Sequence, residues 1–266
     1  MISPTDFPAS SSETEEILRR IIRRCRMGVL AVASLTLITV TAVIMSVVAV
    51  MTVFKARRFY AEVIAKRLGR ALLRLWGIRI VLHQDQHFPQ TQMIYISNHT
   101  STLDMFILIA LGLPNARFFL SGFLRKFVPL GIIGYLIGIF WTSPQEYPGK
   151  RIKCFQAAER VLRRTGESVY LSPEGERVTT GLIGHFNKGA FHLATNLGAP
   201  IVPFYIQIPP ESDPGKGIDA RPGTVHVYVK PAIVTRDWKL GDLDRNRKKV
   251  RDMFIGFHEE LKPARL

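Results

Sequence analysis

The feature that most constrains this chain is an uncharged, proline-free run over residues 27–54. As a helix it would reach roughly 42 Å, more than the ~30 Å hydrocarbon core of a bilayer. The run is too long for a secretory signal, and no small-residue cleavage site follows it. Basic residues flank both ends: Arg19, Arg20, Arg23, Arg24 and Arg26 before it, and Lys55, Arg57 and Arg58 after it. We therefore predict a transmembrane helix over 27–54, whose orientation the two basic flanks leave open.

The segments on either side of this run have their own character. Residues 1–16 are rich in Ser, Thr, Pro and Glu, so we expect segment 1–26 to be a disordered tail that ends in the basic cluster. Residues 55–76 place apolar side chains on one helical face and basic ones on the other. Such a helix either packs on the core of the following domain or lies among lipid headgroups. Beside a membrane span we favour the headgroup position.

From residue 77 to 266 the pattern is that of an α/β domain. Short apolar runs alternate with helical periodicity, which predicts a mixed sheet with parallel strand pairs and flanking helices. A glycine-broken apolar segment over 130–141 is too short to span a bilayer and is expected in the core or at an interface. Strands are expected at 78–82, 93–97, 117–120, 168–171, 201–208 and 224–229, and helices at 105–113, 150–164, 188–197 and 242–262.

Charge and cysteine content narrow the class of protein. A net charge of +15 together with 47% hydrophobic residues is typical of a protein at an anionic membrane surface and unusual for a nucleic-acid binder. We therefore expect membrane lipids as partners and no nucleic acid. Cys25 and Cys154 lie far apart, so the sequence predicts no disulfide framework.

A polar turn follows the buried strand predicted at 93–97 and contains Asn98, His99 and Asp104. Asp104 falls in the first turn of the next helix, where the helix dipole favours an ionised carboxylate. From there it can reach back to one nitrogen of His99, fix the tautomer and leave the other nitrogen as a base. The plainer interpretation is a histidine that caps the helix beside a surface aspartate.

A second polar cluster, Pro173 to Arg177, follows the strand predicted at 168–171. Ligands of open α/β sheets bind beyond the carboxyl ends of the strands, so the two clusters are expected to share one crevice. Arg177 suits a phosphate or carboxylate, and Glu174 either orients it or accepts a substrate hydroxyl. Gly175 shapes the turn, and Lys188 adds positive charge. The alternative is a solvated charged loop. The other histidines lack metal-ligand spacing, so no metal site is expected.

Taken together, the motifs resemble those of the PlsC-like glycerophospholipid acyltransferase family, of the 1-acylglycerol-3-phosphate acyltransferase type. The matching blocks are Asn98–His99 with Asp104, Pro173 to Arg177, and Ala199 to Pro203, three of the family's four blocks in the right order. The resemblance covers roughly residues 76–235 and implies a glycerophosphate acyltransferase-like fold.

The resemblance also implies roles for these residues. In that family the histidine deprotonates an acceptor hydroxyl, which attacks an acyl thioester carried by coenzyme A or acyl carrier protein. His99 would be that base, oriented by Asp104, with Asn98, Glu174, Gly175, Arg177 and Lys188 binding substrate. Pro203 would be structural or line the acyl pocket. No cofactor is implied, since acyl-CoA or acyl carrier protein is a co-substrate. The product would be phosphatidic acid, made by an integral membrane enzyme with its catalytic domain on the cytoplasmic face.

Two departures from the family pattern leave the acceptor open. The run over 138–144 lacks the arginine usual in the second block, and Glu176 stands where threonine is common. Arg125, Lys126 or Lys150 could replace the missing arginine. Another lysophospholipid or a lyso-aminolipid is therefore an alternative acceptor to lysophosphatidic acid. An inactive, membrane-anchored lipid-binding protein is the alternative outside catalysis.

Overall fold

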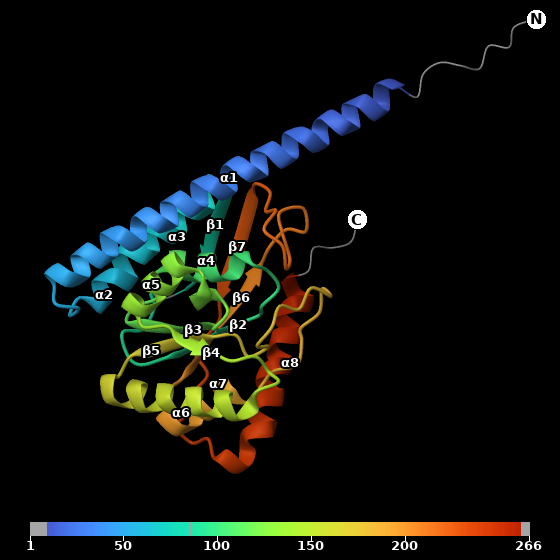
Figure 1. Ribbon diagram of the computed structural model, residues 1–266. Coiled ribbons are helices and arrows are strands. Elements are labelled where there is room, and N and C mark those ends of the chain that lie inside the picture. The colour runs from blue at the N-terminus through green and yellow to red at the C-terminus, as the bar shows by residue number, and fades with distance from the viewer. Residues whose placement is uncertain (1–9, 86, 262–266) are drawn as a thin grey trace, which may run out of the picture.

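The computed structural model describes residues 10–85 and 87–261, and shows an α/β domain with a long amino-terminal helix lying across one side (Figure 1). The helices are α1 (Ser10–Met51), α2 (Arg57–Phe59), α3 (Lys66–Leu75), α4 (Leu103–Leu111), α5 (Val128–Ile137), α6 (Pro148–Thr165), α7 (Gly189–Leu197) and α8 (Leu243–Leu261). The strands are β1 (Ile78–His83), β2 (Ile94–Ser97), β3 (Ala116–Ser121), β4 (Phe140–Thr142), β5 (Ser168–Leu171), β6 (Ile201–Gln207) and β7 (Gly223–Val229). A π-helical turn, η1 (Tyr60–Ala65), and two 3₁₀ turns, η2 (Leu124–Lys126) and η3 (Leu240–Asp242), complete the elements.

The strands form one mixed sheet in the order β1-β7-β6-β2-β5-β3-β4. Every neighbouring pair is parallel except β6 and β7, which are antiparallel. The central strands β2 and β5 are short and wholly buried, as expected for parallel strands covered on both faces. The predicted mixed sheet with flanking helices is therefore confirmed.

Helices cover both faces of the sheet. On one face α6, α7 and α8 bury Leu162, Phe191 and Phe254 against β2, β5 and β6. On the other face α3 and α4 bury Leu73 and Ile107 against the same strands and β7. The turns at the carboxyl ends of β2 and β5 are thereby held on a rigid, two-sided core.

Helix α1 differs from its prediction at the amino-terminal end. It begins at Ser10, so residues 10–26 are helical where a disordered segment was expected, while residues 1–9 lie outside the described residues. Ion pairs of Glu15 with Arg19 and of Glu16 with Arg20 support this part at helical spacing. An apolar helix that already exists also extends at low cost, because nucleation is the unfavourable step. Within the described residues, α1 is the helix long and apolar enough to cross a membrane.

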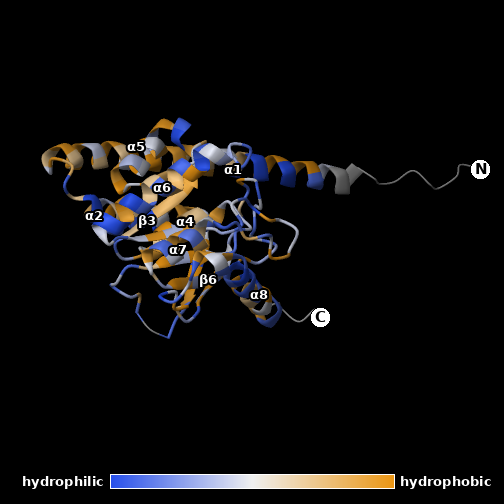
Figure 2. Ribbon diagram, turned by 90° about the horizontal axis from the view of Figure 1, so that it is seen from below, coloured by the Kyte–Doolittle hydropathy of each residue, from blue (hydrophilic) through white to orange (hydrophobic). Residues whose placement is uncertain are grey.

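The amphipathic segment 55–76 forms α2, η1 and α3. Part of its apolar side is turned to protein: Tyr60, Leu68 and Leu72 form a buried cluster with residues of α1 and α5. In α1 the buried members of that cluster are Ile38, Ala42, Met45 and Ala49. Part of the apolar face therefore packs on the domain, whereas Phe59 and Leu75 of the same face are exposed, and the headgroup position of this segment stays a prediction. Figure 2 shows the hydrophobic colouring of α1 where it passes over the domain.

The segment predicted at 130–141 divides between α5 and β4. Ile133, Leu136 and Ile137 of α5 are buried against α1, whereas Val128 and Tyr135 are exposed. Gly138 ends the helix in the left-handed conformation, which lets the chain turn directly into β4. The expectation of a core or interfacial element is confirmed for the buried face of α5.

Candidate active site

Two polar turns meet at the carboxyl edge of the sheet. β2 pairs with β5 in parallel, with Ile94 opposite Val169, so the turn after Ser97 and the loop after Leu171 leave the sheet side by side. The main chain joins them, because the amide of Val178 donates a hydrogen bond to the carbonyl of His99 at 2.8 Å. The two turns that were predicted to share one crevice therefore lie side by side at this edge of the sheet.

His99 and Asp104 are in contact. Nδ1 of His99 lies 2.8 Å from Oδ2 of Asp104, whose side chain is only 1% exposed. The same oxygen accepts hydrogen bonds from the amides of Thr100 at 2.9 Å and Ser101 at 3.0 Å. A carboxylate can only accept, so Nδ1 carries the proton and Nε2 is left with its lone pair. The imidazole is 27% exposed, which leaves it accessible to a substrate.

Glu174 supports the turn that carries His99. Its carboxylate is 3% exposed and accepts hydrogen bonds from the amides of His99 at 2.5 Å and Gly184 at 2.7 Å. Both oxygens are therefore engaged by the main chain, and neither bonds Arg177. Burial raises the pKa of Glu174 to about 7, despite those two hydrogen bonds. This residue positions the turn that carries His99, while the substrate contact predicted for it stays a prediction.

Asn98 and Lys188 also make contacts with the protein itself. The Asn98 side chain is buried, accepts a hydrogen bond from the Ile206 amide at 2.8 Å and donates one to the Ile206 carbonyl at 2.9 Å. This ties the end of β2 to β6. Lys188 pairs with Asp244 at 2.8 Å on an exposed surface between α7 and α8. The predicted substrate contacts of both residues remain untested by this arrangement.

Arg177 is the cation at the rim of the crevice. Its guanidinium donates a hydrogen bond to the Thr102 hydroxyl at 2.5 Å and meets no carboxylate within 4 Å in the described part of the chain. Gly175, two residues earlier, has a φ of +75°, and a Cβ there would lie 2.7 Å from Nδ2 of Asn187. That amide holds the Glu174 carbonyl at 2.9 Å, so glycine lets the loop turn close to its support.

Comparison with known proteins shows what the chain is similar to. The family model described as "Acyltransferase" matches residues 79–207, a stretch that contains both turns. A 1-acyl-sn-glycerol-3-phosphate acyltransferase of Limnanthes alba is 27% identical over 203 residues, covering 71% of this chain and 66% of that protein. The alpha enzyme of the same name from Bos taurus is 27% identical over 195 residues, covering 70% and 65%. The chain thus spans just under two thirds of these relatives.

The fold agrees as well. The crystal structure of PlsC, the 1-acyl-sn-glycerophosphate acyltransferase from Thermotoga maritima, superimposes with a TM-score of 0.74 over 92% of this chain and 99% of that one, at 20% identity. Residues 79–207 of this chain thus form an acyltransferase domain. This domain carries His99, Asp104 and Glu174 to Arg177.

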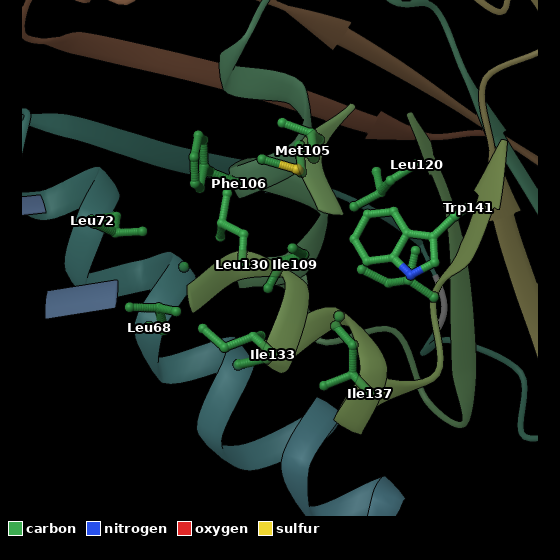
Figure 3. A pocket seen from close by; sticks show the side chains of 15 residues that line it. Leu68, Leu72, Met105, Phe106, Ile109, Leu120, Leu130, Ile133, Ile137 and Trp141 are labelled. Carbon is green, nitrogen blue, oxygen red and sulfur yellow. The ribbon is translucent and has the colours of Figure 1, made fainter. Parts of the chain in front are cut away.

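Two apolar cavities lie on the side of the domain that faces α1. One is lined mainly by α3, α4 and α5, with Leu120 of β3 and Trp141 of β4 closing one end (Figure 3). The other, of about 240 Å³, extends from Thr102 to Leu35 and Ile38 of α1. Phe106 lines both cavities. The second cavity therefore reaches from Thr102, which bonds Arg177, to the candidate membrane helix α1.

The sequence alone did not single out several positioning residues of this acyltransferase domain. Thr102 bonds Arg177, Gly184 bonds Glu174, and Asn187 bonds the Pro173 and Glu174 carbonyls, and the sequence alone assigns none of these three residues a role in the site. Their roles depend on contacts with residues far along the chain, so no local pattern reveals them. The described residues contain no group of three or more His, Cys, Asp and Glu side chains arranged to hold a metal ion.

Proposed function

We propose that this protein transfers a fatty acyl group from acyl-CoA or acyl carrier protein to the free hydroxyl of 1-acylglycerol 3-phosphate, giving phosphatidic acid for phospholipid biosynthesis. The observation that carries the proposal is the buried pairing of Asp104 with Nδ1 of His99, which leaves Nε2 free at a crevice flanked by Arg177. The names of the relatives support the same acceptor.

In the proposed reaction His99 is the general base. Nε2 takes the proton of the acceptor hydroxyl as its oxygen attacks the thioester carbonyl. The carbon–sulfur bond then breaks, and the imidazolium returns the proton to the departing sulfur. Asp104 stabilises the imidazolium through the 2.8 Å hydrogen bond. Such general-base help is worth about 10²–10⁴-fold, and no metal, cofactor or covalent acyl-enzyme is needed.

The surroundings of the site support amphiphilic substrates. The cavity that reaches from Thr102 to α1 offers apolar space for an acyl chain next to a polar reaction centre. A net charge of +15 attracts polyanionic donors such as coenzyme A and acyl carrier protein. We further propose that α1 holds the domain at the membrane with the catalytic side facing the cytoplasm, which protease access to a carboxyl-terminal tag in sealed vesicles would test.

The test is acyl transfer by the purified, detergent-solubilised protein. Labelled acyl-CoA is offered with lysophosphatidic acid, lysophosphatidylglycerol, lysophosphatidylcholine or a lyso-aminolipid, and the series is repeated with acyl carrier protein as donor. We expect label on lysophosphatidic acid and a loss of about 10³-fold or more in His99→Ala, with an unchanged melting temperature.

Other outcomes distinguish the alternatives. Label on a different acceptor would keep the mechanism and change the substrate, as the missing arginine in 138–144 suggests. Lipid binding without turnover, unaffected by His99→Ala, would instead favour the non-catalytic lipid-binding protein.

A further inference from the structure

A second arginine lies at the Gly175 loop, brought there from a distant part of the chain. If Gly175 had a Cβ, Nη2 of Arg151 would be 3.7 Å from it and Nε2 of Gln145 3.4 Å from it. Arg151 is in the first turn of α6, and Gln145 is in the connection between β4 and α6. β3 separates β4 from β5, and all three strands are parallel, so this connection leaves the sheet at the same edge as the Glu174–Arg177 loop.

Arg151 is half-buried and has no anionic partner. Within residues 10–85 and 87–261 its guanidinium makes no hydrogen bond or ion pair with the protein. Glu146 precedes Arg151 by five residues and Glu176 directly follows Gly175, but both are exposed and neither pairs with Arg151. An arginine that has lost part of its hydration without gaining a carboxylate is favourably placed to bind an anion from outside the protein.

Arg177 and Arg151 both lie at the turn that contains Gly175, and neither guanidinium pairs with a carboxylate in the described residues. Arg177 follows Gly175 by two residues and donates only to the neutral hydroxyl of Thr102. Arg151 approaches Gly175 from the other element, and the absence of a side chain at Gly175 keeps the space between loop and guanidinium open. Two guanidiniums and the amide of Gln145 match the acceptor oxygens of a phosphate monoester, which planar forks bind in bidentate fashion.

We infer that Arg151 binds the acceptor phosphate together with Arg177 and replaces the arginine missing from residues 138–144. The inference rests on the proposed function, because it assigns a residue to the phosphate of that acceptor. It also departs from the candidates favoured by the sequence: Arg125 lines an exposed groove with α1 and α5, Lys126 lies over the Phe123 ring, and Lys150 lies over the Tyr147 ring.

The experiment separates binding of the acceptor from binding of the donor. KM and kcat are measured for lysophosphatidic acid and for acyl-CoA in the wild type, Arg151→Ala, Arg151→Lys and the matched control Arg160→Ala. Arg160 lies on the same helix and is exposed, so its removal subtracts the same charge away from Gly175. The wild type and Arg151→Ala are also compared with 1-monoacylglycerol, an acceptor without phosphate.

For Arg151→Ala we expect KM for lysophosphatidic acid to rise about 10- to 100-fold, as for the loss of a charge-assisted hydrogen-bond pair. kcat and KM for acyl-CoA should change less than about threefold, Arg151→Lys should be intermediate, and Arg160→Ala should resemble the wild type. Transfer to 1-monoacylglycerol, however slow, should be equal in the wild type and Arg151→Ala.

Three results would overturn the inference. An unchanged KM for lysophosphatidic acid in an active, folded Arg151→Ala would remove Arg151 from the site and leave the proposed function intact. A rise confined to KM for acyl-CoA would assign Arg151 to the phosphates of the donor. No turnover of lysophosphatidic acid by the wild type would overturn the proposed function together with this inference.

Discussion

Arginines stand at both edges of the sheet, and their partners differ. At the amino-terminal edge Glu167, whose side chain is 8% exposed, accepts hydrogen bonds from both Arg57 and Arg117. At the carboxyl edge Arg177 bonds a neutral hydroxyl, and Arg151 bonds nothing in the described part of the chain. Guanidiniums at one edge are neutralised within the protein and join α2 to the sheet. Those at the other edge are left for an anionic ligand.

The buried glutamates of the two edges show the same difference. Burial acts to raise the pKa of Glu167, but the hydrogen bonds and charges of Arg117 and Arg57 outweigh it and hold that pKa below its usual range. Burial also raises the pKa of Glu174, where the partners are main-chain amides, and there it prevails, to about 7. The arginines that pair with Glu167 thus stabilise the fold. Glu174 is bonded to main-chain amides and does not neutralise the charge of the neighbouring Arg177.

The largest effect on stability is expected from Glu167→Ala. It leaves the partly buried Arg57 and Arg117 without a carboxylate, which should lower the free energy of unfolding by about 3–5 kcal/mol. Chemical denaturation in detergent measures this, with Glu260→Ala as the control, because Glu260 pairs with Lys230 on the surface. Protein that stays folded should keep its kcat/KM. A stable Glu167→Ala variant with a raised KM for lysophosphatidic acid would break the contrast between the edges.

A smaller effect concerns Glu174 and pH. Its pKa is about 7 in the folded protein against an ordinary value of 4.5, so the folded state binds the proton more tightly than the unfolded state. The resulting stability is present below about pH 4.5 and is lost as pH rises through about 7, an effect on the order of 1–3 kcal/mol.

The matched variant for this test is Glu174→Gln. We expect it to be less stable at every pH, because an amide accepts through only one of its two heavy atoms and leaves one main-chain N–H without a partner. The decline in melting temperature between pH 4.5 and 7 should be shallower than in the wild type. Parallel profiles in the two proteins would mean that Glu174 is not the group responsible.

The smallest effect is expected from Lys188→Ala. This lysine is paired, but its pair with Asp244 is exposed, and exposed ion pairs contribute little. Melting temperature and KM for lysophosphatidic acid should both stay at the wild-type values. A raised KM would instead support the prediction from the sequence that Lys188 binds substrate. The cations available to an anionic ligand would then include one at the start of α7.

Local features were predictable because short-range geometry decides them. Five residues separate His99 from Asp104, and a strand that ends directly before a helix brings their side chains together. Strand β5 was predicted at its observed bounds, and β1, β2, β3, β6 and β7 to within one residue at each end, from apolar runs between turns. Strand β4 was not predicted as a strand, because its residues continue the apolar run of α5. The start of α1 at Ser10 was not predicted, because the prediction for residues 1–26 relied on their polar composition. An existing helix can extend through such residues when charged side chains pair at i,i+4 spacing.

By itself the sequence determined the apolar amino-terminal helix, the mixed α/β fold class and the histidine–aspartate pair, since each depends on neighbours a few residues apart. Only the tertiary structure decided that Glu174 supports His99, that segment 55–76 packs part of its apolar face on α1 and α5, and that Arg151 reaches Gly175. These contacts join residues that the order of strands brings together, and strand order is set by the packing of the whole sheet. No periodicity in a single segment records it.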